Sequence, residues 1–267
     1  MQTKSFSRAS FVTLAGLVLA ALAPDASATH SWGGYHWART GNPFTLKLGN
    51  NVSGAAWGSA LGTASSDWSA SDVLNTTLVT GLANPRNCRP TSGRVEVCNS
   101  TYGSTGWLGV ASIWLTGGTH ITQGTVKLND SYFNTATYNT PAWRALVTCQ
   151  EVGHTFGLDH QDTTFDNANL GTCMDYTNDP STNQHPNTHD YQELDIIYLH
   201  GDASTTIGQS VGSSFADIDT NDPRNWGRLV KVSKDGRTAI YELDLGGGRK
   251  IVTFVIYALE ANGNRAQ

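Results

Sequence analysis

The interpretation of this chain depends on the stretch Gln150-Glu151-Val152-Gly153-His154-Thr155-Phe156-Gly157-Leu158-Asp159-His160. On a helix, Gln150 and His154 stand at positions i and i+4 and share one face, with the Glu151 carboxylate beside them. A zinc site of the His-Glu-x-x-His type uses this spacing for two imidazole ligands and a general base. Here Glu151, His154, Gly157 and His160 keep that register, and Gln150 stands in place of the first histidine.

The stretch predicts a role for each of its polar residues. A catalytic zinc site needs three protein ligands and one open position for water. We expect His154 and His160 to be metal ligands and Glu151 to be the general base that takes a proton from water. Gly157 permits a sharp turn after the helix, so that His160 approaches the metal from another direction.

A second motif lies downstream, in Gly171-Thr172-Cys173-Met174-Asp175-Tyr176. Together the two motifs resemble the metzincin clan of zinc endopeptidases, strongly over residues 149–162 and 172–176 and more loosely over 44–201. The resemblance implies an α/β (α+β) zincin fold with a twisted mixed sheet, an active-site helix and a Met-turn at Met174. It also implies zinc as cofactor and a protein or peptide as substrate.

The resemblance implies two further features. The run 106–111 is similar to the edge strand of matrixin-like members, against which the substrate lies extended. In astacin-like and serralysin-like members, a tyrosine two residues after the methionine is an additional metal ligand. Tyr176 has that spacing and is therefore a candidate ligand or oxyanion stabiliser. The alternative is a packed tyrosine whose hydroxyl bonds to the backbone.

Gln150 is the departure from the pattern, because its neutral amide oxygen is a weaker zinc donor than imidazole. Three interpretations stay open. Gln150 binds zinc weakly and Tyr176 helps to complete the ligand set, or another residue such as His120 or Asp162 is recruited. In the third, catalysis is lost and the metzincin-like fold serves as a peptide- or protein-binding module.

The N-terminus has the layout of a secretory signal peptide. Lys4 and Arg8 precede an apolar run at 11–23, and small residues at 26–28 form a cleavage site after Ala28. The run is too short to span a bilayer, although an uncleaved anchor is the alternative. We therefore expect residues 1–28 to be removed and the mature protein to be secreted, extracellular or periplasmic, without further membrane association.

The four cysteines, Cys88, Cys98, Cys149 and Cys173, are expected to form disulfides in an exported chain. Three pairings are conceivable. We favour Cys88 with Cys98, which closes a short loop, and Cys149 with Cys173. Each of the latter two immediately precedes a signature residue, so this bridge joins the two motifs.

The remaining pattern divides the mature chain into a metalloprotease-like domain at 29–201 and a β-rich extension at 202–267. Strands are expected at 44–48, 74–80, 106–115 and 121–128. Helices are expected at 54–69, from 141 to near 157, and at 190–200. In the extension, 238–245 and 250–259 flank a triple glycine and predict a hairpin. The sequence leaves open whether this hairpin joins the main sheet or forms an appended unit.

Composition limits the partners. The net charge of the 267 residues is −5, which does not favour nucleic acid as a partner, and we expect a monomer. Two segments are candidate calcium loops, 217–222 and 162–169. The first has the opening spacing of a calcium loop, but Asp222 stands where glycine is expected and Arg228 stands where the closing glutamate is expected.

Overall fold

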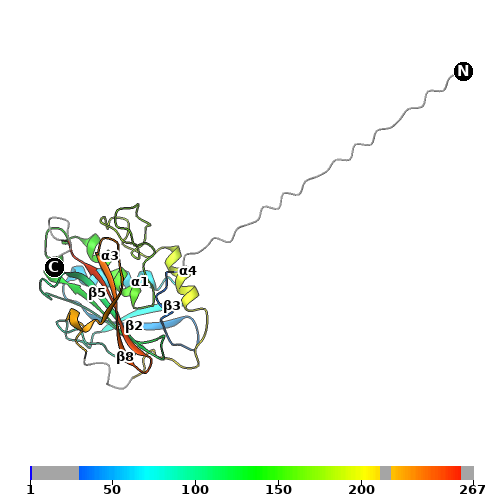
Figure 1. Cartoon of the computed structure of the whole chain (residues 1–267), viewed down its shortest axis with the longest axis horizontal. Helices are drawn as coiled ribbons and strands as arrows, with labels where there is room; N and C mark the ends of the chain where they lie inside the picture. Colours follow the sequence, from blue (N-terminus) through cyan, green and yellow to red (C-terminus); the bar gives the residue numbers. More distant parts are fainter. Residues whose placement is uncertain (2–29, 211–217, 260–267) are drawn as a thin grey trace.

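The computed structural model describes Met1, residues 30–210 and residues 218–259 (Figure 1). Within these ranges the strands form one nine-stranded mixed sheet in the order β3-β2-β4-β6-β5-β9-β8-β7, with the short β1 beside β6. The predicted α+β class with a mixed sheet is thus observed, while residues 2–28 of the predicted signal peptide lie outside the described residues. The elements are β1 His36–Trp37, β2 Phe44–Asn51, α1 Ala55–Trp68, β3 Leu74–Thr80, β4 Val95–Ser100, β5 Trp107–Thr116, β6 His120–Asn129, α2 Asp130–Phe133, α3 Pro141–His154, α4 Thr188–Ile197, η2 Pro223–Asn225, β7 Arg228–Val232, β8 Thr238–Gly246 and β9 Arg249–Tyr257.

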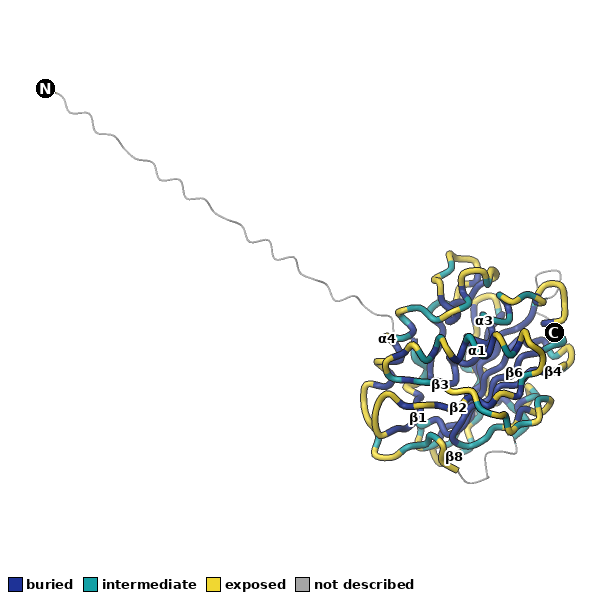
Figure 2. Tube along the Cα trace, turned by 180° about the vertical axis from the view of Figure 1, so that it is seen from behind, coloured by how far each residue is buried: buried dark blue, intermediate teal, exposed yellow. Residues whose placement is uncertain are grey.

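The sheet has a parallel part and an antiparallel part. Strands β2, β3, β4 and β6 run parallel to their neighbours in this group, whereas β5 is antiparallel to both β6 and β9. Helices α1 and α3 pack on each other, α1 against β3 and α3 against β5 and β6. The central strands are almost wholly buried, and the exposed residues gather in the loops (Figure 2).

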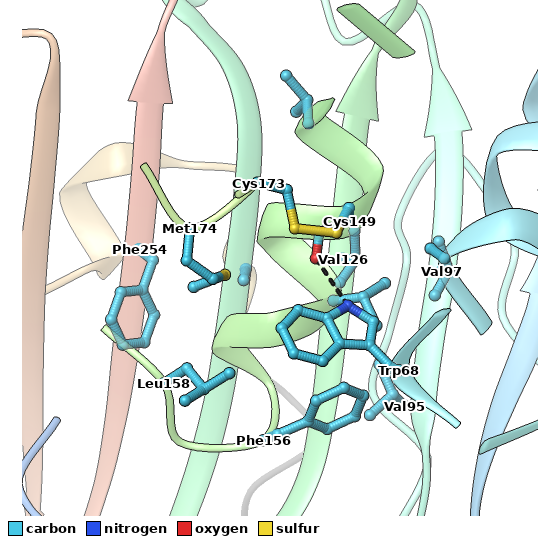
Figure 3. Close-up of a cluster of buried hydrophobic side chains, with 14 of the residues drawn as sticks. Trp68, Val95, Val97, Val126, Cys149, Phe156, Leu158, Cys173, Met174 and Phe254 are labelled. Atoms are coloured by element: carbon cyan, nitrogen blue, oxygen red, sulfur yellow. Dashed lines mark hydrogen bonds between the residues drawn. A yellow bond between two sulfur atoms is a disulfide. The ribbon is translucent and has the colours of Figure 1, made fainter. Parts of the chain in front are cut away.

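Helix α1 forms where apolar residues recur at helical spacing. Trp57, Leu61, Ala64 and Trp68 are all buried on one face, as the 3.6-residue period requires. Trp68 closes the contact with α3 by donating its indole N–H to the carbonyl of Cys149 at 3.1 Å (Figure 3). The helix is observed within the predicted range of 54–69.

Helix α3 begins where the sequence predicts, because the Thr140 side chain accepts the Trp143 N–H at 3.2 Å and Pro141 occupies the first turn. It ends at His154, three residues earlier than predicted. The chain then turns at Gly157, whose φ is +99°. A Cβ at this position would lie 1.9 Å from the carbonyl oxygen of Tyr35, so both the backbone conformation and the close approach require glycine.

Helix α4 starts and ends earlier than the predicted 190–200. The Asn187 side chain caps the N–H groups of His189 and Asp190, and Asp190 completes a capping box on the N–H of Asn187. This reciprocal cap fixes the start at Thr188. Gly201 therefore lies beyond the helix, which ends at Ile197.

The C-terminal strands continue the main sheet, which is one of the two alternatives that the sequence leaves open. Strand β9 pairs with β5 along its length, β8 pairs with β9, and β7 pairs with β8. The expectation that 106–111 forms an edge strand is therefore wrong. Strand β5 lies inside the sheet, and both of its hydrogen-bonding edges are occupied.

Both disulfides have the favoured pairing, Cys88 with Cys98 and Cys149 with Cys173. The second connects α3 to the segment that carries Met174. Met174 is fully buried beneath α3, where a Cβ on Gly153 would lie 2.7 Å from its sulfur. Figure 3 shows Met174 between this disulfide and Phe254. Among the described residues, no helix is both long and apolar enough to cross a membrane.

A lysine side chain bonds to two residues of the first candidate calcium loop. The Lys127 ammonium lies 2.7 Å from the Thr220 hydroxyl and 2.5 Å from the Asn221 amide oxygen. Asp217 lies outside the described residues. Two oxygens of this loop thus bond to Lys127. Burial lowers the pKa of Lys127 to about 7, although Asp219 acts in the opposite direction.

Lys127→Met is expected to remove a pH dependence of stability. The pKa of Lys127 is lower in the folded than in the unfolded chain, so the unfolded chain binds more protons between pH 7 and the ordinary lysine pKa. The free energy of unfolding should therefore rise over pH 7–9, with a slope of at most about 1.4 kcal/mol per pH unit. Chemical denaturation at several pH values measures this slope. Lys47→Met, at an exposed position of β2, is the control and should keep it; an unchanged slope in Lys127→Met contradicts the prediction.

Candidate metal centre

Helix α3 and the turn after it bring the signature residues together. Gln150, Glu151 and His154 are buried on α3, and His160 returns toward the helix after the turn at Gly157. The Nε2 atoms of His154 and His160 lie 3.1 Å apart, and the ring centroids are separated by 4.4 Å. The structure therefore places the two predicted histidine ligands side by side.

The hydrogen bonds of the two rings indicate which nitrogens carry protons. His154 Nδ1 lies 2.9 Å from the carbonyl oxygen of Leu158, and His160 Nδ1 lies 3.3 Å from Asp159 Oδ1. Because both partners are acceptors, each Nδ1 must donate, which leaves a lone pair on each Nε2 of the neutral rings. Burial lowers the pKa of His154 well below its ordinary value and also lowers the pKa of His160, which favours the neutral forms.

Two facing lone pairs at this distance repel each other unless a cation or a shared proton lies between them. In a tetrahedral zinc site with bonds of 2.0–2.1 Å, two ligand atoms lie about 3.3 Å apart. The separation of 3.1 Å between His154 Nε2 and His160 Nε2 matches this geometry. The pair therefore fits the ligand arrangement of a zinc ion.

Gln150 presents its amide oxygen as an available donor. Its Nε2 donates to the carbonyl of Cys173 at 2.8 Å and lies 3.5 Å from the carbonyl of Asp175. A flipped amide would direct its oxygen against these two carbonyls, so the orientation is determined by the network. The buried Oε1 then accepts no hydrogen bond from the part of the chain that the structure describes. A buried acceptor without a partner is rare, and a metal ion would satisfy it.

Glu151 has a similar unsatisfied atom. Its carboxyl group accepts the N–H of Ala111, but its buried Oε2 has no hydrogen-bond partner among the described residues. Burial raises the pKa of Glu151 well above its ordinary value, and the Ala111 bond only partly offsets this. Gly109 makes room for the group, since a Cβ there would lie 2.8 Å from Glu151 Oε1.

Asp159 supports His160 from behind. Its Oδ1 accepts from the His160 N–H at 2.8 Å and faces the ring, while its Oδ2 pairs with Lys231 Nζ at 2.6 Å. Burial alone would raise the pKa of Asp159, but the bonds and charges of His160 and Lys231 outweigh it and hold the pKa well below its ordinary value. A carboxylate that orients a ligand histidine is a recurrent partner in metal sites.

Aromatic rings close the centre. Tyr176 lies against His160 with ring centroids 4.0 Å apart, Phe165 stacks on Tyr176 at 4.8 Å, and Phe254 of β9 stacks on His154 at 4.3 Å. Burial raises the pKa of Tyr176 well above its ordinary value, and a hydrogen bond with the Thr238 side chain acts against it. Outside Phe165 lies a surface hollow of about 290 Å³, lined by Thr163, Thr164, Phe165, Asp166, Lys234 and Asp235.

Other candidate ligands lie in other arrangements. His120, at the start of β6, faces Asp202 with a distance of 3.3 Å between Nε2 and Oδ1, and so belongs to another cluster. The Asp162 carboxylate accepts from the Thr164 N–H and the Asn167 amide, both at 2.5 Å. Its loop is closed by these local bonds. In the structure, neither His120 nor Asp162 joins the His154–His160 pair.

Four residues around the centre escaped the sequence analysis: Asp159, Phe165, Lys231 and Phe254. Asp159 had a signal, because it directly precedes His160 and a ligand histidine commonly has a carboxylate partner. Lys231 and Phe254 come from the C-terminal strands. The positions of those strands in the sequence give no indication that they contact α3.

Comparisons with known proteins identify no family. No protein-family profile matches the chain, and no curated protein matches it. Two solved structures of myroilysin are similar to it. One is 12% identical, with a TM-score of 0.34, and the match covers 64% of this chain and 83% of that chain. The other is 10% identical, with a TM-score of 0.31, covering 65% and 87%. TM-scores of this size carry no argument about activity, so the function must be inferred from the residues of the site.

Gln150→His is expected to tighten zinc binding. Imidazole is a stronger zinc donor than a neutral amide oxygen, and the new ring can donate Nδ1–H to the carbonyl that Gln150 now uses. We expect affinity to rise by at least about tenfold, which is about 1.4 kcal/mol. Competition with a chromophoric chelator measures this. Gln184→His, whose parent side chain bonds to Ser181 at the surface, is the matched control. Equal affinity in the parent and Gln150→His would show that Gln150 is not at a metal position.

Proposed function

We propose that this chain is a secreted zinc-dependent endopeptidase of the metzincin type, which hydrolyses protein or peptide substrates. One observation carries the proposal: two Nε2 lone pairs face each other at 3.1 Å, and Glu151, on the same helix as His154, has a buried carboxyl oxygen without a partner among the described residues. These are the donors and the general base that the signature predicts.

The proposed ligand set is Gln150, His154 and His160. It is supported by the unpartnered Gln150 Oε1 and by the Nδ1–H bonds that hold both imidazoles in the metal-binding tautomer. Asp159 orients His160, and Lys231 fixes Asp159. Tyr176, which contacts the His160 ring, is the nearest candidate for a further ligand or for a hydrogen bond to the developing oxyanion.

The mechanism assigns a separate task to each residue. When bound by Gln150, His154 and His160, zinc would supply Lewis-acid chemistry for the activation of water and the polarisation of the scissile carbonyl. Glu151 takes the proton from water and delivers it to the leaving amine. The Ala111 N–H keeps the carboxyl group in place during both transfers.

Substrate access requires a movement of the aromatic rings. Phe165 and Tyr176 lie between the surface hollow and His160. The guanidinium group of Arg237 stacks on Phe165, with its central carbon 3.8 Å from the ring centre. Phe254 belongs to β9, which is paired on both sides and is part of the core. We therefore propose that Phe165 and Tyr176, rather than β9, move aside to admit the substrate.

The alternative function is a peptide-binding module without catalysis. In its simplest form, a peptide would add to the edge of β5, and the pairing of β5 with β9 removes that edge. A binding module would also have no use for a buried carboxyl group, which costs free energy when it is unpaired. The lost edge counts equally against a peptidase that binds its substrate along β5, so only the second point favours the peptidase.

Glu151→Gln is expected to abolish cleavage and to keep zinc. The amide retains the size of the side chain and its bond to the Ala111 N–H, but cannot accept a proton, so kcat/KM should fall by about 10²–10⁴. Peptide-library cleavage by the mature chain, read by mass spectrometry, measures activity, and metal analysis measures zinc. Glu242→Gln, on β8, should leave both unchanged. Turnover that survives in Glu151→Gln would remove this residue from the mechanism, and zinc binding without turnover in the parent would favour the binding module.

A further inference from the structure

A second histidine cluster lies where β1, β6 and the segment after α4 meet. The pairing of β1 with β6 sets His36 opposite His120. His200 and Asp202 follow α4 and reach the same point. None of these residues takes part in the proposed hydrolysis. Within the described residues, His36, His200 and Asp202 are the one group of three or more histidine, cysteine or acidic side chains whose ligand atoms all lie within 4.8 Å of one another.

Three ligand atoms converge in this cluster, and a fourth lies beside one of them. His36 Nε2 and His200 Nε2 are 3.1 Å apart, and Asp202 Oδ1 lies 3.5 Å from the first and 3.7 Å from the second. His120 Nε2 approaches the same oxygen at 3.3 Å. The separations are close to the distance of about 3.3 Å between two ligands of a tetrahedral zinc ion.

The outer contacts of the cluster fix the ligand atoms in position. His36 Nδ1 lies 2.8 Å from the carbonyl oxygen of Gly34, so this nitrogen donates and a neutral ring presents its Nε2 lone pair to the cluster. Asp202 Oδ2 accepts the Arg39 backbone N–H at 3.1 Å and Arg39 Nη1 at 2.9 Å. Oδ1 is thereby directed at the histidines. Hydrogen bonds of this kind on the far side of each ligand are typical of metal sites.

The protons available to the cluster depend on His200. The lone pair of a neutral His36 ring points toward Asp202 Oδ1, which offers it no proton, and toward His200 Nε2, which offers one only in its Nε2–H tautomer. The group is also largely withdrawn from water, since His36 and Asp202 are 6% and 9% exposed at their side chains, whereas His200 is 51% exposed. One side of the cluster thus stays open for an ion to enter.

We propose that His36, His200 and Asp202 form a zinc site, separate from the candidate catalytic centre, with His120 beside the carboxylate oxygen. Two imidazoles and a carboxylate are ligands that zinc commonly takes. The ion would connect β1, near the start of the mature chain, to the segment that leads from α4 into the C-terminal strands. Its proposed role is structural, because the ion would join two segments that are far apart in the sequence.

The experiment counts zinc in a variant that lacks the candidate catalytic centre. In the double variant His154→Ala/His160→Ala of the mature chain, equilibrium dialysis against zinc followed by metal analysis should find about one equivalent bound. Adding Asp202→Asn or His200→Ala should remove it. His185→Ala, whose parent imidazole pairs with Asp67 at the surface, is the matched control and should retain it. No bound zinc in the double variant, or the same amount after Asp202→Asn, overturns the proposal.

Thermal unfolding gives a second readout that does not depend on activity. At a zinc concentration about one hundred times the Kd, the Tm of the double variant should rise by about 5–10 °C. His200→Ala changes a half-exposed side chain and should fold, yet its Tm should not respond to zinc. A zinc-dependent rise that persists in His200→Ala would place the ion elsewhere and would also overturn the proposal.

Discussion

The arrangement of the candidate centre depends on the close approach of the Tyr35 carbonyl to Gly157. No side chain fits between them, and the turn at Gly157 has a φ of +99°. This turn directs His160 back against His154. Neighbouring backbone bonds hold it in place, from the Trp32 N–H to the Gly157 carbonyl at 3.0 Å and from the Asp159 N–H to the His30 carbonyl at 2.5 Å. Residues 30–35 therefore flank the turn that positions His160, a proposed ligand.

The polar atoms of the centre show why a metal is the consistent interpretation. Gln150 Oε1 and Glu151 Oε2 are buried without hydrogen-bond partners among the residues described, and each such atom costs about 1–3 kcal/mol. The rings of Tyr176 and Phe254 pack on His160 and His154, and Phe165 stacks on Tyr176. A cation held by the proposed ligands would offset this energetic cost.

Local signals made part of this structure predictable from the sequence. The N-cap and proline at 140–141 located α3, the apolar spacing located α1, and the signature identified Gln150, Glu151, His154 and His160 as neighbours. Strands β4 and β7 were missed. Strand β4 is buried along most of its length, so its residues lack the alternation that marks a half-buried strand, and β7 is a short strand at the sheet margin. Contacts between residues more than seventy positions apart could not be predicted from the sequence. They are the pairing of β9 with β5, the contact between Lys231 and Asp159, and the contact between His120 and Asp202.

The position of Phe254 has a consequence for how the protein is made. The ring that covers His154 belongs to β9, Arg249–Tyr257, which follows α3 far along the chain. During synthesis, the histidines of the signature are complete long before β9 exists, and pairing of distant strands is among the slower steps of folding. Until β9 inserts beside β5, His154 lacks its aromatic cover and β5 has an open edge. The order of residues along the chain thus delays closure of the centre until β9 has been synthesised.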